Sequence, residues 1–242
     1  MRLALISDIH GNLEALTAVL RDIEDKGADE IACLGDVVGY GCDPQACLEL
    51  VARTCRVKLL GNHDAAALGR TPIEGYNSTA RITAEWTRTV LSDRDRACLE
   101  SFTLQHRALG ALLVHASPCR PDQWPYILAP DEAAEAFGAF TEPICFHGHT
   151  HIPAIFTEIP GAFPARRVAH DIDPHEESRY LINVGSVGQP RDRDPRACWT
   201  LYDAAEGAIA FRRVAYDIAR TQSKMSEAHL PDTLVERLAA GR

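Results

Sequence analysis

The chain has 242 residues, of which 46% are hydrophobic and 24% charged, a composition that excludes a disordered or fibrous protein. Its formal net charge of −9 makes nucleic acid an unfavourable partner, because a negative surface repels the phosphate backbone. The apolar run at the N-terminus is too short for a signal peptide, and no run is long enough to span a membrane. We therefore expect a cytoplasmic protein without a membrane partner.

The first sixty residues alternate between predicted strands and helices. Continuous apolar runs predict buried strands, and apolar residues at helical spacing predict helices. The order is strand, helix, strand, helix, strand, at residues 2–7, 13–26, 30–34, 44–53 and 57–60. This order predicts a parallel sheet that is covered by helices.

The remainder of the chain is predicted to contain fewer helices. One long helix is expected at 76–101, and one or two more follow residue 216. Strands are expected at 104–108, 111–114, 144–147, 154–158, 179–184, 197–203 and 208–214. Residues 116–130 and 160–178 contain several prolines and are predicted to be irregular. No linker interrupts the pattern, so we expect one α/β domain over residues 1–242.

Polar side chains follow most of the buried strands at the point where each strand ends. They are Asp8 and His10, Asp36, the run Asn62-His63-Asp64, His115, and the pair His149 and His151. In an open α/β sheet the ligand binds beyond the carboxyl ends of the strands. These segments therefore deliver Asp, His and Asn to one edge of the molecule.

The residue types at this edge suit a transition-metal site. Imidazole and carboxylate together favour Mn, Fe, Zn, Co or Ni, and Asp36 has two oxygens that could bridge two ions. A single Asp or His at a strand end is more often a helix cap or a surface residue, but several together are unusual. His106, His170, His175 and His229 have no such setting, and His147 is expected on the other side of its strand. The eight cysteines form no CxxC pair, and we assign none of them a chemical role.

Five short motifs resemble those of the calcineurin-like metallophosphoesterases and occur in the same order. They are Asp8-Ile9-His10, Gly35-Asp36, Gly61-Asn62-His63-Asp64, His115 and Gly148-His149-Thr150-His151. Residues 39–41, 118–128 and 183–191 are similar to segments of the small prokaryotic phosphodiesterase branch. Cys42 and Ala116 depart from that branch at positions that are not ligands. The resemblance implies a two-sheet β-sandwich flanked by helices, in four layers of helix, sheet, sheet and helix.

The resemblance also implies a role for each polar residue. Asp8, His10 and His151 would hold one metal ion, Asn62, His115 and His149 a second, and Asp36 would bridge the two. A hydroxide between the ions would attack phosphorus in line. His63 would protonate the leaving oxygen or donate a hydrogen bond to it, and Asp64 would orient His63 or cap a helix at 65–70. Arg191 is either a substrate-phosphate contact or a surface residue.

The implied function is hydrolysis of a phosphorylated small molecule or nucleotide with two divalent ions, Mn first, with Fe, Zn, Ni and Co as alternatives. Few cations accompany the predicted ligands, so we expect a phosphodiester to be preferred to a monoester. The alternatives to this function are a phosphoprotein or nucleotide phosphatase and a non-catalytic metal-binding scaffold of the same fold. Tyr40, Trp124 and Tyr126 would stack on a base or pack locally.

Overall fold

The computed structural model describes residues 1–175 and 177–242 and contains two β-sheets that pack face to face. In spatial order, the first sheet consists of β11 (Ile209–Val214), β10 (Ala197–Asp203), β1 (Arg2–Ile6), β2 (Glu30–Cys33) and β3 (Val57–Lys58). The second consists of β4 (Gln105–Ala108), β5 (Ala111–Val114), β6 (Ile144–His147), β9 (Arg179–Asn183), β7 (Ala154–Glu158) and β8 (Ala165–Val168).

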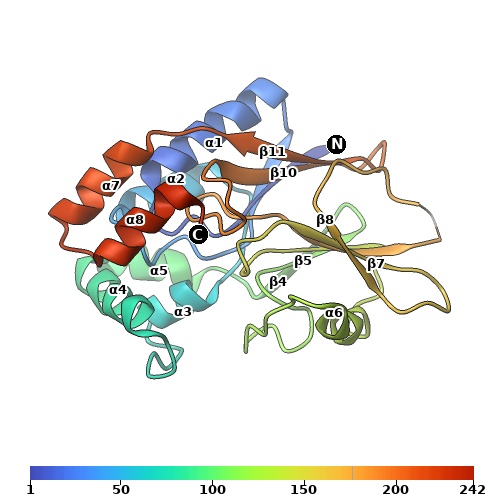
Figure 1. The fold of residues 1–242 in the computed structure, drawn as a ribbon, viewed down its shortest axis with the longest axis horizontal. Helices are drawn as coiled ribbons and strands as arrows, with labels where there is room; N and C mark the ends of the chain where they lie inside the picture. The colour runs from blue at the N-terminus through green and yellow to red at the C-terminus, as the bar shows by residue number, and fades with distance from the viewer. Residues whose placement is uncertain (176) are drawn as a thin grey trace.

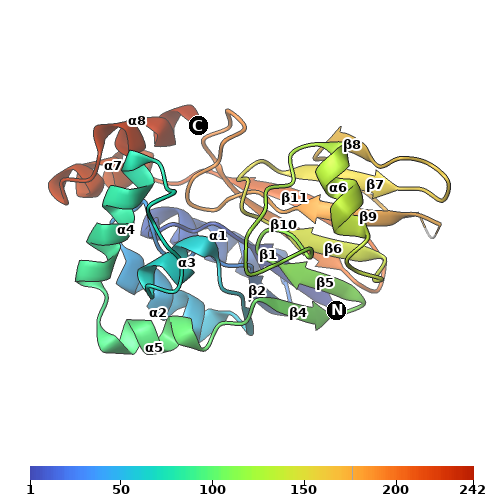
Figure 2. The same cartoon turned by 90° about the horizontal axis from the view of Figure 1, so that it is seen from below.

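Helices cover the outer face of each sheet, and their distribution is uneven (Figures 1 and 2). The helices of the first sheet and its margin are α1 (Leu13–Lys26), α2 (Pro44–Thr54), α3 (Asn62–Ala67), α4 (Ser78–Val90), α5 (Asp93–Glu100), α7 (Ile218–Glu227) and α8 (Asp232–Ala240). On the second sheet α6 (Pro130–Phe137) packs through Ala133, Ala136 and Phe137. This confirms the predicted four-layer sandwich.

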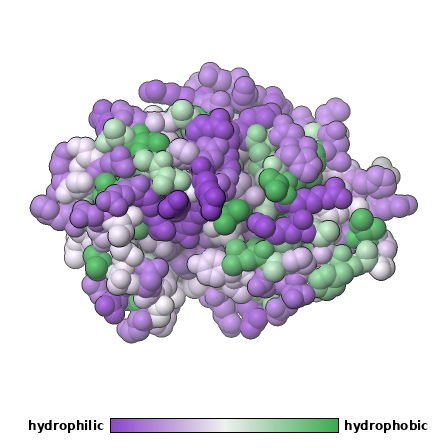
Figure 3. All heavy atoms as spheres, in the orientation of Figure 1, coloured by the Kyte–Doolittle hydropathy of each residue, from purple (hydrophilic) through white to green (hydrophobic). Residues whose placement is uncertain are grey.

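The interior between the sheets is apolar. Leu3 and Leu5 of β1 and Leu34 after β2 meet Leu113 of β5 and Phe146 of β6 in one buried cluster. Burying each such side chain stabilises the fold by about 1.5–3 kcal/mol. The face seen in Figure 3 is mostly hydrophilic, and its apolar residues form small separate groups. Among the described residues, no helix has both the length and the apolar character needed to cross a membrane.

Strand direction explains where the polar residues lie. In the first sheet β1, β2 and β3 run parallel, and in the second β5, β6 and β9 run parallel. Parallel strands end at the same edge, so each sheet presents several carboxyl ends together. The predicted strand-end residues therefore follow elements that finish side by side.

Several predicted boundaries were wrong. The helix expected at 76–101 is two helices, because Ser92 caps the start of α5 through the backbone N–H of Asp95. The third strand is shorter than expected, and Asn62, His63 and Asp64 begin helix α3 instead of following the strand as a loop. The segment 160–178, expected to be irregular, contains β8.

Candidate metal centre

The strand ends bring the predicted ligands of both sheets together in two buried groups. The first group is Asp8, His10 and His151, and the second is Asp36, His115 and His149. Within each group the ligand atoms all lie within 4.8 Å of one another. Each group takes side chains from both sheets, since Asp8, His10 and Asp36 follow β1 and β2, and the other three follow β5 and β6.

The spacing in the first group matches a shared ion. The Nε2 atoms of His10 and His151 are 3.1 Å apart, and Asp8 Oδ1 lies 3.4 Å from His151 Nε2 and 3.9 Å from His10 Nε2. Ligand atoms about 2.1 Å from one ion are roughly 3.0–3.4 Å apart. The three atoms therefore stand at nearly the separation that one bound ion requires.

Asp36 lies between the two groups. Its Oδ2 atom is 3.6 Å from His10 Nε2 in the first group and 3.4 Å from His115 Nε2 in the second. The Oδ1 atom of Asn62 is 3.3 Å from the same His115 nitrogen, which adds a neutral oxygen to the second group. This is the position that a bridging carboxylate needs.

Three of the histidines are oriented by backbone carbonyl groups. The Nδ1 atoms of His10, His115 and His151 lie 3.0, 2.9 and 2.7 Å from the carbonyl oxygens of Val38, Leu34 and Gln189. A carbonyl oxygen only accepts, so in each ring Nδ1 carries the proton and donates. In the neutral ring this leaves the Nε2 lone pair directed at the site, which is the form that binds a metal ion.

Unusual backbone conformations aim several of these side chains. Asp8, His10, Asp36, His149 and His151 all have positive φ, between 49° and 68°. Such a conformation costs an ordinary residue roughly 1–2 kcal/mol. Gly61 permits the close packing around Asp36, because a Cβ atom at residue 61 would collide with the Asp36 carboxylate.

Burial and neighbouring charges set the protonation states of the predicted ligands in both groups. It lowers the pKa of His10, His149 and His151 well below the usual histidine range, so these rings are neutral. Burial would also lower the pKa of His115, but the Asp36 carboxylate outweighs it and raises that pKa to about 9. Burial raises the pKa of Asp8 to about 7. The charge of His115 counters the burial of Asp36 and holds its pKa well below its usual value.

The donor set fits two divalent ions. Asp8 Oδ1 and His149 Nε2 are buried and have no hydrogen-bond partner in the described part of the chain. Two lone pairs also face each other at 3.1 Å between His10 and His151. Buried acceptors without donors are costly, and a cation between them would remove the cost. Imidazole and carboxylate ligands without thiolate suit the transition metals named above.

His63 lies beside the groups and is not a member of either. Its ring centroid is 5.0 Å from that of His10 and 4.4 Å from that of Tyr40, and its Nδ1 atom is buried without a partner. Burial lowers the pKa of His63 to about 4, so the ring is neutral at neutral pH. A neutral ring donates a hydrogen bond more readily than it gives up a proton.

Asp64 does not make the expected contact with the His63 ring. Its Oδ1 accepts from the backbone N–H groups of Val37 and Val38 at 3.0 and 3.1 Å. Its Oδ2 accepts from those of Asp36 and Gly61 at 2.8 and 3.0 Å. The bond from Gly61 caps α3 from the third position of the helix, whereas the alternative interpretation expected Asp64 to stand before a helix at 65–70. Asp64 therefore ties the loop after β2 to the start of α3.

A model of the calcineurin-like phosphoesterase superfamily domain matches residues 1–206. The chain belongs to this superfamily. It is also 38% identical over 246 residues to an uncharacterized protein of Methanocaldococcus jannaschii, with 99% of this chain and 98% of that protein covered.

Solved structures agree with the assignment. A metallophosphoesterase from Sphaerobacter thermophilus is 42% identical, with a TM-score of 0.88 and coverage of 100% of this chain and 99% of that one. A hypothetical protein from Pyrococcus horikoshii is 21% identical, with a TM-score of 0.78 and coverage of 100% and 98%, which shows the shared fold. Membership in the phosphoesterase superfamily supports phosphoric ester hydrolysis as the general chemistry.

Tyr76 is a residue of this phosphoesterase site that the sequence analysis missed. Asn62 Nδ2 donates to the Tyr76 hydroxyl at 3.0 Å, and that hydroxyl donates to the backbone oxygen of Asn62 at 3.1 Å. The pair of bonds turns the amide oxygen of Asn62 toward His115. Nothing in the sequence marks Tyr76 as a site residue, because residue 76 lies at the start of the helix predicted over 76–101.

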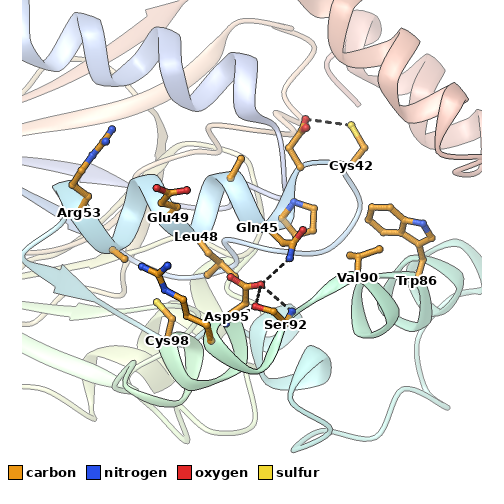
Figure 4. A pocket seen from close by; sticks show the side chains of 15 residues that line it. Cys42, Gln45, Leu48, Glu49, Arg53, Trp86, Val90, Ser92, Asp95 and Cys98 are labelled. Carbon is orange, nitrogen blue, oxygen red and sulfur yellow. Dashed lines mark hydrogen bonds between the residues drawn. The ribbon is translucent and has the colours of Figure 1, made fainter.

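The site opens into a cavity of about 320 Å³ lined by aromatic residues. Tyr40, Tyr76, Trp124 and Tyr126 line it together with Asn62, His63 and His149. The rings of Tyr126 and His149 stack with centroids 4.2 Å apart, so Tyr126 is at least partly engaged in local packing. A larger cavity of about 880 Å³ lies between α2, α4 and α5, and none of the predicted ligands lines it (Figure 4).

Arg191 lies at the edge of the metal centre and is not a free surface residue. Its guanidinium carbon is 5.7 Å from the centroid of the Tyr40 ring, and its charge contributes to lowering the pKa of His10, His63 and His151. By contrast His106, His170, His175 and His229 are exposed and distant from both groups, as expected. His147 is buried beside Asn183 and belongs to neither group. The eight cysteines are free.

Proposed function

We propose that this protein is a phosphodiesterase that works with two divalent transition-metal ions. The observation that carries the proposal is the pair of buried His and Asp groups with the Asp36 carboxylate between them. One ion would be held by Asp8, His10 and His151, and the other by Asn62, His115 and His149. Asp36 would bind both ions. Ions held there would neutralise phosphate charge and lower the pKa of a water ligand, which is the chemistry that a paired site supplies.

The remaining residues of the site bind and orient the substrate. His63 lines the cavity beside the ligands, where its ring can donate a proton or a hydrogen bond to the leaving oxygen. Arg191 supplies a guanidinium for a phosphate oxygen. Asp64 supports the site by joining the loop that carries Asp36 to the start of α3, which carries His63. Residues 1–242 would act as one domain, because α8 packs against Tyr40 at the site.

A phosphodiester suits this site better than a monoester. A monoester dianion needs paired donors to offset its desolvation, and the ligand segments contain no Lys or Arg. Arg191 supplies a cation beside the ligands. We expect Mn²⁺ to be the most effective ion, with Fe, Zn, Ni or Co as substitutes.

The first experiment measures metal content and hydrolysis together. Elemental analysis of the purified protein should find two ions per chain, and hydrolysis of bis-p-nitrophenyl phosphate should stop on chelation and return with Mn²⁺. His149→Ala should lose one of the two ions and the hydrolysis, whereas His106→Ala, the same change at an exposed strand position, should keep both ions and the hydrolysis. Metal binding without hydrolysis of any phosphate ester would favour the scaffold alternative and refute the proposal.

The second experiment tests the preferred ester. A dinucleotide or cyclic nucleotide is compared with its 5′-monophosphate at saturating Mn²⁺, so that metal occupancy does not differ. The proposal expects a higher kcat/KM for the diester. Faster turnover of the monophosphate at every pH would favour a nucleotide phosphatase instead.

A further inference from the structure

Two arginines meet on one buried glutamine beside the metal centre. The side-chain oxygen Oε1 of Gln189 accepts from Arg191 Nη2 at 2.9 Å and from Arg237 Nη1 at 3.4 Å. Gln189 is only 2% exposed, so this shared acceptor is fixed within the protein. The two guanidinium groups are therefore neighbours, although their residues lie in a loop and in the C-terminal helix α8.

The two arginines lack the carboxylate partners that nearby arginines have. Arg213 pairs with Asp192, and Arg196 pairs with Asp194 at 2.7 Å. Within the described residues, neither Arg191 nor Arg237 forms an ion pair, and the buried Nε of Arg191 has no hydrogen-bond partner. A neutral amide oxygen does not balance two like charges. Burial, with the charge of Arg191 added, lowers the pKa of Arg237.

Gln189 also connects this arginine pair to the first metal group. Its backbone oxygen accepts from His151 Nδ1 at 2.7 Å, while its side chain holds both guanidinium groups. Burial and the charge of Arg191 lower the pKa of His151, and the same two causes lower the pKa of Arg237. Arg191 therefore acts electrostatically on the metal centre as well as on Arg237, its neighbour on Gln189.

Helix α8 is held firmly in this position. Leu234 and Leu238 pack in the same buried cluster as Tyr40, whose ring contacts that of His63. At the end of the helix the backbone N–H of Arg193 donates to the carbonyl oxygen of Gly241 at 2.8 Å. The guanidinium of Arg237 is therefore presented by a docked helix, which limits the entropy lost when it binds an anion.

We propose that Arg191 and Arg237 form a binding site for a second phosphate group of the substrate, one that is linked to the scissile phosphate and is not itself hydrolysed. This rests on the proposed function, since it names the class of ester that the same metal centre would take. Guanidinium groups bind phosphate oxygens through paired hydrogen bonds, and two of them can donate to both free oxygens of one phosphate group. The substrate class is then a diester or anhydride with adjacent phosphates.

The experiment compares two esters with the same leaving group. The p-nitrophenyl esters of AMP and ADP both release p-nitrophenol, but only the ADP ester has a second phosphate next to the scissile one. In the metal-loaded protein, Arg237→Gln should lower kcat/KM for the ADP ester by about tenfold more than for the AMP ester, mainly through KM. Arg237→Lys should recover part of the difference, and Arg242→Gln, which removes the same charge beyond α8, should leave both esters unaffected.

A binding measurement separates this inference from the proposed function. Calorimetry measures the binding of AMP and ADP without turnover. The wild-type protein should bind ADP more tightly than AMP, and Arg237→Gln should abolish this difference in affinity. Equal losses for both esters, or an ADP preference that survives in Arg237→Gln, would overturn the second-phosphate site. Absence of hydrolysis with an intact, Arg237-dependent preference for ADP would refute the proposed function and leave the site standing.

Discussion

Replacing Asp64 with asparagine should destabilise the protein far more than a single amide substitution normally does. The carboxylate accepts four backbone N–H bonds, two on each oxygen. In Asp64→Asn one oxygen becomes an NH₂ group, which faces two donors and can accept from neither. A hydrogen bond to a charged group contributes about 1.5–3 kcal/mol, so losing two costs about 3–6 kcal/mol of unfolding free energy.

The assay is urea unfolding at pH 8, because burial raises the pKa of Asp64 to about 7 and the carboxylate must be ionised. Asp95→Asn is a matched control. Asp95 occupies the same third position of helix α5 and accepts from the backbone N–H of its capping residue Ser92 at 2.9 Å (Figure 4). It is only partly buried, whereas Asp64 is fully buried. Its loss should cost about 1 kcal/mol.

The metal affinity of the two variants gives a second measurement. Asp64→Asn should also weaken metal binding, because its bonds to residues 36–38 hold the loop that carries Asp36. Asp95→Asn should bind metal as the wild type does. Equal destabilisation of the two variants, with metal affinity unchanged in both, would show that Asp64 does not connect these loops as described.

Three further changes test individual side chains. Asp36→Asn should lower metal content at both sites, whereas Asp8→Asn should lower it at one site. Elemental analysis measures this difference. Two bound ions in Asp36→Asn would rule out a bridging role for Asp36. His63→Asn should keep both ions and lose about 10²–10⁴ in kcat, with a smaller loss for good leaving groups. An equal loss for all leaving groups would assign His63 to phosphate positioning. Tyr76→Phe should weaken metal affinity about 10–100-fold, because it releases the side-chain amide of Asn62. Competition with a chelator measures this affinity. An unchanged affinity would exclude a role for Tyr76 in orienting Asn62.

Strand-end residues could be located from the sequence because two local signals coincide there. A buried parallel strand is a short apolar run, and the polar residue that ends it is visible beside it, as with Asp8 after β1 and Asp36 after β2. Topology then requires that such ends meet. That reasoning placed the polar residues at one edge of the molecule, and only the family resemblance divided them into two groups of metal ligands.

Contacts between distant segments could not be anticipated in the same way. The hydroxyl of Tyr76 and the guanidinium of Arg237 reach the site because of how α8 and the segment before α4 pack, and this packing depends on the whole chain. Asp64 was expected to contact His63, its neighbour in the sequence. Three of its hydrogen bonds instead come from backbone N–H groups in a loop 26–28 residues away. Side-chain direction at a helix start is decided by such tertiary bonds.

Because each metal group takes ligands from both sheets, ions held there would fasten the two halves of the sandwich together. A ligand that binds only the folded chain stabilises it, by about 2.7 kcal/mol at a free concentration of one hundred times its Kd. When metal is scarce, more of the protein would populate open forms that proteases degrade. Metal supply would therefore govern how long each molecule survives in the cell as well as how fast it works, and starvation would remove the protein instead of leaving it idle.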